Sequence, residues 1–297
     1  MKFSLAKSTA GDRVFYTLTF IFLTLFFLVV LYPCVFVVSA SFSSGQAVQS
    51  GRVLLLPVDP TLAGYRTVFN TRNVWLGFRN SIFYTAAATI GSVILTMTAS
   101  YCLARKDLPG RGFFIFLYTF TMFFSGGLIP SYLLNRSLGL INKIWIMIIP
   151  GVGAWNMIIG KTFIQNSIPG ELFDAATMDG CSDFYYFVRI VIPLSKAIIA
   201  VFALFIGVAS WNSYFHPMIY LNNRSLYPLT IFLREVLLVT QIDPSTVEDP
   251  ELQARIAAMA AIIKYALIVV STVPVIVIYP FVQKHFVKGV LIGSIKG

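Results

Sequence analysis

Six apolar runs separated by shorter polar segments dominate the 297-residue chain. Each run has roughly twenty residues, enough for an α-helix to cross the hydrocarbon core of a bilayer. An even number of crossings places both chain ends on the same side of the membrane. The pattern therefore predicts an all-α integral membrane fold with six transmembrane helices, at about 14–38, 80–104, 112–134, 141–163, 190–215 and 261–283.

The first run imitates a secretion signal, because Lys2, Lys7 and Arg13 precede it and Val38-Ser39-Ala40 closes it. At about 25 residues it is much longer than the apolar region of a signal peptide. We therefore expect a retained helix. The second and fifth runs contain Ser, Thr, Asn and Gly, which suits helices that pack against other helices or line a cavity.

Composition agrees with a membrane protein, since 57% of the residues are hydrophobic and 11% are charged. The net charge of +10 comes from Lys and Arg residues scattered between apolar blocks, which favours loop charges and headgroup anchors over a nucleic-acid surface. Basic residues next to the runs follow the positive-inside rule if both termini are cytoplasmic. The rule rests on Lys2, Lys7, Arg13, Arg105, Lys106, Arg111, Lys284, Lys288 and Lys296.

The residue types that carry most site chemistry are sparse. The three cysteines, Cys34, Cys102 and Cys181, are far apart, and His216 and His285 have no acidic or cysteine companion at ligand spacing. We therefore expect no metal site and no disulfide. The acidic residues lie outside the six runs, and Lys264 is the one basic residue drawn clearly into a run, near its outer edge, which weighs against a proton-coupled carrier.

ATP chemistry is also missing from the chain. Gly151-Val152-Gly153 and the later Gly160-Lys161 lack the spacing and hydroxyl residue of a phosphate-binding loop, so an ATPase would be another polypeptide. No H-E-x-x-H sequence and no nucleophile with a base at plausible spacing occurs. Two alternatives stay open at this point: an ATP-independent carrier or channel, and a membrane-embedded enzyme of glycan assembly.

The polar segment 167–180 predicts a short helix with both ends marked. Pro169 suits a first turn, Glu171 favours the positive end of the helix dipole, and Gly180 can close the helix in a left-handed conformation. Spacings of three and four residues place four side chains on one face: Leu172, Ala175, Ala176 and Asp179. The alternative is an amphipathic interfacial helix without a partner.

This segment resembles the E-A-A loop of binding-protein-dependent ABC importer permeases. The resemblance lies in Asp174-Ala175-Ala176, Asp179-Gly180 and Ile190-Val191-Ile192-Pro193, with Asp174 where the family usually has Glu. It implies a type I importer permease fold whose cytoplasmic coupling helix, within a loop at 167–193, seats in a groove of the ATPase. The residues that it assigns to ATPase coupling are Glu171, Leu172, Asp174, Ala175, Ala176, Asp179, Gly180, Ile190 and Pro193.

Further segments are similar to the MalG-like carbohydrate permeases. They are Asn80-Ser81, Trp211-Asn212-Ser213-Tyr214 and the tail 286–297, and the segment 124–133, Phe-Ser-Gly-Gly-Leu-Ile-Pro-Ser-Tyr-Leu, resembles the polysaccharide-type branch. This branch includes importers of uronic-acid oligomers, so a second permease of an alginate importer is one specific expectation. Arg residues in the outer loops would tolerate an acidic sugar.

The resemblance also implies the partners and the division of labour. They are a second homologous permease, two ABC ATPase subunits that carry ATP and Mg, an extracytoplasmic solute-binding protein and an oligosaccharide. The chain itself would be a non-catalytic permease subunit of a bacterial inner membrane that binds no cofactor. In the relatives the tail reaches between the ATPases, which assigns Gly289, Gly293, Lys296 and Gly297 to that interface, where an extended segment would fit; a frayed terminus is the alternative.

Candidates for the sugar path combine aromatic faces with amides, which bind the C–H surfaces and hydroxyls of sugars. They are Asn80, Asn156, Trp211, Asn212 and Tyr214. The aromatic residues could equally be interfacial anchors, and each Asn could bond to a neighbouring helix. We expect residues 1–13 to be a cytoplasmic N-terminus, 14–284 the transmembrane permease domain and 285–297 a cytoplasmic tail.

Overall fold

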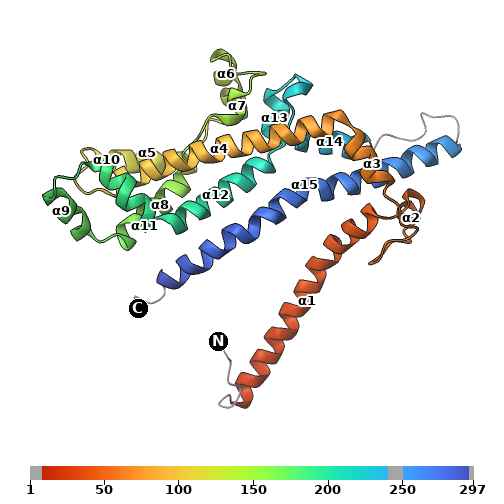
Figure 1. Cartoon of the computed structure of the whole chain (residues 1–297), viewed down its shortest axis with the longest axis horizontal. Coiled ribbons are helices and arrows are strands. Elements are labelled where there is room, and N and C mark those ends of the chain that lie inside the picture. The colour runs from red at the N-terminus through yellow and green to blue at the C-terminus, as the bar shows by residue number, and fades with distance from the viewer. Residues whose placement is uncertain (1–8, 240–249, 294–297) are drawn as a thin grey trace. The chain divides into compact units, whose positions relative to one another are not determined.

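The computed structural model describes residues 9–239 and 250–293, and within these ranges it is helical without a β-strand. The described residues form two compact units. Among the described residues, unit 1 comprises 9–71, 235–239 and 250–270, and unit 2 comprises 72–234 and 271–293. Figure 1 shows the helices, and their bounds are α1 Ala10–Ser41, α2 Gly45–Gln49, α3 Ala63–Asn70, α4 Arg72–Ala104, α5 Arg111–Phe123, α6 Leu128–Ser137, α7 Trp145–Ile148, α8 Ala154–Ser167, α9 Gly170–Met178, α10 Asp183–Tyr186, η2 Phe187–Val191, α11 Ile192–Leu194, α12 Lys196–Trp211, α13 Phe215–Tyr220, η3 Arg224–Leu226, α14 Leu229–Val239 and α15 Pro250–Gly293.

Three helices are long and apolar enough to cross a membrane, and their spanning parts are Gly11–Ser41, Arg72–Ala104 and Glu251–Pro280. Two further candidates are bent pairs: α5 with α6, at 118°, and the segment Asp183–Leu194 with α12, at 79°. The described structure thus holds three to five candidate spans.

The predicted count of six transmembrane helices is therefore not confirmed, because the helices are interrupted within the third, fourth and fifth runs. In the third run the chain leaves the helix at Phe124 and re-enters it after Gly127, whose φ of 80° and ψ of −179° are open only to glycine. Residues 149–153 separate α7 from α8, and this segment contains Pro150 and two glycines. Proline and glycine interrupt helices because proline lacks an N–H and glycine has many alternative conformations.

In unit 1, the end of α1 and the segment after it are packed onto the first half of α15. A Cβ atom on Gly45 would come within 2.3 Å of the Ala258 carbonyl oxygen, and one on Gly64 within 2.9 Å of the Ile262 carbonyl oxygen. The Phe36 and Tyr265 rings meet edge to face at 5.7 Å. The two glycines therefore let the segment that follows α1 approach the backbone of α15 closely and hold it in place. The most apolar window of α1, in contrast, has no residue buried within the chain.

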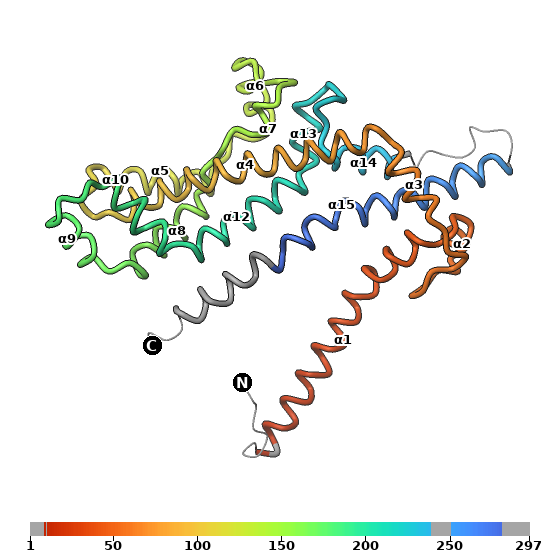
Figure 2. The backbone as a smooth tube through the Cα atoms, in the orientation of Figure 1, coloured from red at the N-terminus to blue at the C-terminus, as the bar shows by residue number. Residues whose placement is uncertain are grey.

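In unit 2, α4 is the central helix, and Figure 2 shows α8 and α12 running beside it. Small and polar residues make the close contacts: Gly160 of α8 has room only for hydrogen beside Ser100, whose Oγ donates to the Met157 carbonyl oxygen at 3.2 Å. Phe202 of α12 is fully buried in the same core. The prediction that the second and fifth runs pack against other helices is confirmed.

The first part of α4 holds the segment 224–229 by four hydrogen bonds. Asn80 Nδ2 donates to the Ser225 and Tyr227 carbonyl oxygens at 2.8 and 3.1 Å. The Tyr84 hydroxyl donates to the Leu226 carbonyl oxygen at 3.0 Å, and the Leu229 N–H donates to Ser81 Oγ at 2.9 Å. Residues 80, 81 and 84 share a helix face, which explains why polar residues occur at these positions of an apolar run.

Candidate functional site

The helix predicted in the segment 167–180 is α9, and its ends are confirmed. It starts at Gly170, directly after Pro169, and Asp179 is its C-terminal cap. Gly180 follows with a φ of +73°, the left-handed conformation that the sequence predicted. Nothing lies within 4 Å of a Cβ built on Gly180, so backbone conformation alone requires glycine there.

The predicted common face of α9 is divided between two surroundings. Ala176 is buried, and Phe173 packs against the same core cluster. Leu172, Ala175 and Asp179 are exposed, as is Met178, whose side chain is 85% exposed. The small side chain of Ala176 therefore serves packing within this chain, and the free face of α9 is formed by Leu172, Ala175, Met178 and Asp179.

Arg105, directly after α4, connects α4 to α9 and α10. Its guanidinium carbon lies 3.7 Å from the centroid of the Phe173 ring, a cation–π contact. The same group donates to both Asp107 carboxylate oxygens, to Asp183 Oδ1 at 2.9 Å and to the Tyr101 hydroxyl at 3.3 Å. One side chain thus joins three parts of the chain that are far apart in sequence.

Charge pairing shifts the pKa values of Arg105 and Asp107. The hydrogen bonds from Arg105 lower the pKa of Asp107 to about 2, so that its carboxylate is ionised throughout the physiological range. The Asp107 carboxylate in turn raises the pKa of Arg105, against the opposing effect of burial. The contact is therefore a fully charged, bidentate ion pair at neutral pH.

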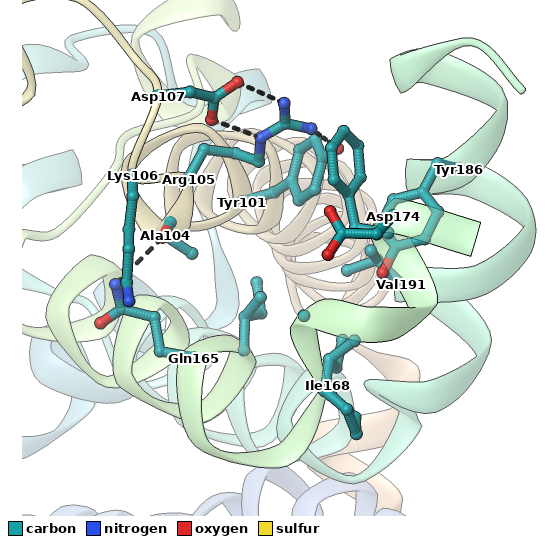
Figure 3. A pocket seen from close by; sticks show the side chains of 14 residues that line it. Tyr101, Ala104, Arg105, Lys106, Asp107, Gln165, Ile168, Asp174, Tyr186 and Val191 are labelled. Atoms are coloured by element: carbon teal, nitrogen blue, oxygen red, sulfur yellow. Dashed lines mark hydrogen bonds and ion pairs between the residues drawn. The ribbon is translucent and has the colours of Figure 1, made fainter. Parts of the chain in front are cut away.

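A cavity of about 730 Å³ lies between α9 and the end of α4. Figure 3 shows residues of its lining: Tyr101, Arg105 and Tyr186 in the upper part of the view, Gln165 and Ile168 in the lower part, and Asp174 between them. Gln165 Nε2 closes one corner by donating to the Ala104 carbonyl oxygen at 3.0 Å. Helix α9 is therefore attached through Ala176, Phe173 and the contacts of Arg105, with open space beside them, which suits an element that is pushed or pulled as a body.

Sequence reasoning missed Arg105 as a site residue and treated it only as a charge that indicates orientation. Asp107, two residues later, is a local sign of the ion pair. Asp183, in contrast, is 78 positions away, and only the fold brings it close.

Comparison with known proteins places the chain in a family, although no protein family model matches it. It is 40% identical to the polygalacturonan/rhamnogalacturonan transport system permease protein YtcP of Bacillus subtilis (strain 168), over 96% of this chain and 99% of the relative. It is 37% identical to protein LplC of the same organism, over 98% of this chain and 97% of the relative. A solved chain matches with a TM-score of 0.84 and 33% identity, over 94% of this chain and 99% of that chain; its structure is that of a bacterial ABC transporter involved in the import of the acidic polysaccharide alginate.

The chain is a carbohydrate ABC importer permease. It belongs to the MalG-like, polysaccharide-type branch that the segment 124–133 indicated. The coarse predictions of an all-helical permease fold and of a multi-pass protein of the inner membrane are confirmed.

The remaining residues of the predicted coupling loop lie around α9 in the permease. Glu171, in the first turn, and Asp174 are exposed. Ile190 is half-buried in the π-helical turn η2, and Pro193 is exposed in α11. Pro193 has no N–H to return to the preceding turn, which widens, and the Ile192 N–H donates to the Phe187 carbonyl oxygen five residues back.

The predicted tail residues lie at or beyond the end of α15. Gly289 and Gly293 belong to this helix, so the expected extended conformation is wrong up to Gly293. Lys296 and Gly297 lie outside the described residues.

The five sugar-path candidates divide into two groups. Asn80 uses both amide hydrogens on loop carbonyls, and the buried Trp211 donates its Nε1–H to the Ser271 carbonyl oxygen at 3.0 Å. Asn156 is half-buried in α8, and Asn212 and Tyr214 are exposed after α12.

Among the side chains described, no three His, Cys, Asp or Glu residues gather into a metal-binding group.

Proposed function

We propose that this permease is the transmembrane subunit of a binding-protein-dependent ABC importer for oligosaccharides or polysaccharide fragments, in which α9 is the coupling helix. The observation that carries the proposal is the division of α9. Its free face, formed by Leu172, Ala175, Met178 and Asp179, is exposed in the described chain, while its other face is joined to α4 through Phe173 and Arg105.

Such a helix can transmit force from a partner ATPase on its free face to the helices of unit 2 on its other face. Two ATPase subunits that hold ATP and Mg would close on ATP and displace α9 as a rigid lever. Arg105 would carry the displacement to the end of α4, the central helix of unit 2, and the permease would alternate between outward and inward access. The chain itself catalyses no bond cleavage in this scheme.

Six crossings are consistent with the described helices if each interrupted run counts once. The crossings are then α1, α4, α5 with α6, α7 with α8, the segment from α10 to α12, and α15. Both termini would be cytoplasmic, with 1–13 before the permease domain 14–284 and 285–297 after it. The exposed apolar surface of α1 would face lipid and a second, homologous permease.

The substrate class follows from the relatives and from the charge of the chain. The named relative YtcP is a permease for polygalacturonan and rhamnogalacturonan, and the solved neighbour comes from an importer of alginate. Arg residues in the outer loops would tolerate an acidic glycan delivered by an extracytoplasmic binding protein. Asn156, Asn212 and Tyr214 have side chains free to meet a sugar, whereas Asn80 and Trp211 would support the path from behind through their hydrogen bonds.

The test is ATP hydrolysis and oligosaccharide uptake by the reconstituted complex carrying Ala175→Arg. Arginine keeps the helix propensity of α9 but adds a bulky charge to its free face. We expect normal assembly of the permeases, with hydrolysis stimulated by the binding protein reduced at least tenfold. Gly112→Arg is the matched control, because Gly112 is also surrounded by open space and lies outside α9.

Two results would contradict the proposal. Unchanged uptake by the Ala175→Arg complex would show that α9 transmits nothing. Uptake by the wild-type permeases without any ATPase would instead establish an ATP-independent carrier or channel.

A further inference from the structure

The third apolar run is interrupted by four non-helical residues, Phe124, Ser125, Gly126 and Gly127. They separate α5 from α6, whose axes meet at 118°, and in Figure 1 α6 projects away from α4 and α5. We call these four residues the break. The proposed function does not account for it.

The break lies at membrane depth if α5 begins at the cytoplasmic surface. Helix α5 has 13 residues from Arg111, and at 1.5 Å per residue it is about 20 Å long. The hydrocarbon core is about 30 Å thick, and any tilt of α5 keeps its end further from the opposite surface. The break therefore falls inside the core.

Several backbone groups of the break have no hydrogen-bond partner among the residues that the structure describes. They are the N–H groups of Ser125, Gly126 and Gly127 and the carbonyl groups of Phe124, Ser125 and Gly126. The Gly127 carbonyl oxygen, in contrast, accepts from the Ser131 hydroxyl at 2.7 Å. Lipid cannot satisfy such groups, so irregular backbone at this depth is tolerated only inside protein or along a water-filled path.

Open space surrounds both glycines. Nothing lies within 4 Å of a Cβ built on Gly127, and one on Gly126 would meet only Pro130, at 3.8 Å. Packing within this chain therefore does not explain why both residues are glycine. Gly127 is required by its backbone conformation, and Gly126 leaves the adjacent N–H and carbonyl groups accessible to a ligand.

Two stacked aromatic rings mark the start of the break: one belongs to Phe124 itself and the other to Phe120, in the last turn of α5. The Phe120 and Phe124 rings stack at 4.4 Å between centroids with 13° between their planes. Phe116, one turn earlier, continues the row at 6.1 Å from Phe120. Phe124 is 64% exposed, so an apolar ring surface adjoins a set of unpaired hydrogen-bonding groups.

We propose that the break and the Phe120–Phe124 ring pair form a sugar-contacting segment of the translocation path. A sugar presents C–H faces that stack on aromatic rings and hydroxyl groups that both donate and accept hydrogen bonds, which matches this surface. Water would satisfy the same backbone groups when no sugar is present. The inference rests on the proposed function, and it names a site that involves backbone atoms rather than Asn156, Asn212 or Tyr214.

The first experiment measures whether water and sugar reach the break. Ser125→Cys is introduced into a permease whose Cys34, Cys102 and Cys181 are replaced by alanine, and the full complex is treated with a charged methanethiosulfonate, which reacts with thiolates in water. We expect modification that an imported alginate or polygalacturonan oligomer slows at least threefold. Val29→Cys, in the middle of α1, is the matched control and should stay unmodified.

The second experiment measures the contribution of the rings. Phe120→Ala and Phe124→Ala should each lower maximal oligosaccharide uptake by about three- to tenfold, the equivalent of one lost aromatic contact. Hydrolysis of ATP stimulated by the binding protein should persist, and Phe124→Tyr should restore uptake. Phe113→Ala is the control, because Phe113 is equally exposed, at 64%, but lies at the other end of α5.

An unreactive Ser125→Cys would overturn the inference, because lipid or the second permease would then cover the break. So would alanine variants of Phe120 and Phe124 that transport as well as Phe113→Ala. These results leave the proposed function intact as long as the wild-type complex imports sugar with ATP. Loss of ATP dependence in the wild type would reject the proposed function instead.

Discussion

Replacement of Arg105 by alanine should release α9 from the end of α4. The Asp107 and Asp183 side chains that pair with Arg105 are 65% and 70% exposed, so each ion pair contributes only about 0–1 kcal/mol. The cation–π contact with Phe173 contributes about 1 kcal/mol, since only 20% of the Arg105 side chain is exposed. The Tyr101 hydroxyl would lose its charged donor at a cost of about 1 kcal/mol.

These contributions sum to about 2–4 kcal/mol of local stability at α9. Amide hydrogen exchange of residues 171–180 in the detergent-purified permease reports this quantity, and we expect exchange about 30- to 1000-fold faster in Arg105→Ala. Arg105→Lys should recover only part of the protection, because an ammonium group lacks the planar fork that pairs with Asp107 and stacks on Phe173.

Arg111→Ala is the matched control. Arg111 is the first residue of α5, close to Arg105 in the chain, and its Nε donates to the Leu103 carbonyl oxygen at 2.8 Å, but α9 is not among its partners. If Arg105→Ala left exchange in α9 unchanged, or if Arg111→Ala accelerated it equally, the assignment of Arg105 as the connection between α4 and α9 would be refuted.

Three further outcomes are expected. Gly180→Ala should destabilise the end of α9 by about 1 kcal/mol, because the left-handed φ is unfavourable for alanine while the surrounding space is open; faster exchange confined to residues 176–180 would show this. Asn80→Ala should lower the local stability of the loop around Ser225 and Tyr227 by about 2–3 kcal/mol, because two of its carbonyl groups lose their donor. Faster proteolysis near residues 222–228 would show this. An unchanged cleavage rate would contradict the role of Asn80 in holding the loop. Acidification should leave the protection factors of the α9 amides, which are the exchange rates relative to the intrinsic rates at the same pH, unchanged from pH 7 to about pH 4. The lowered pKa of Asp107 makes the contribution of its ion pair with Arg105 complete above the unfolded value of 3.8 and lost as the pH falls through about 2. A fall in the protection factors between pH 7 and pH 5 would contradict this sign.

Prediction from sequence was most successful for features with local causes. Unbroken apolar runs predicted α1, α4 and the greater part of α15, because length and hydrophobicity are sufficient for a helix in a bilayer. Capping signals predicted both ends of α9, including the φ of Gly180, because caps involve neighbours within one turn. The segment 124–133 indicated the branch of the family, although its conformation was not foreseen.

Prediction failed where glycine allows the backbone either to continue as a helix or to leave it. The apolar content of the run 112–134 predicted one helix, but Gly126 and Gly127 permit a break that hydrophobicity cannot reveal. The family resemblance implied an extended tail within 286–297, which its glycines would permit, yet α15 continues to Gly293. Glycine allows both conformations, and the rest of the structure selects one.

The sequence alone determined the class of this protein: a helical membrane permease with a capped loop helix, since hydrophobic length, capping and family motifs all act over short distances in the chain. The tertiary structure alone decided which side chains support that helix and which remain free for partners or sugar. It brought Arg105 to Asp183, and it committed Asn80 to the loop at Ser225 and Tyr227. Hydrogen bonds and ion pairs between residues 78 to 147 positions apart exist only after the helices have packed, so no local pattern predicts them.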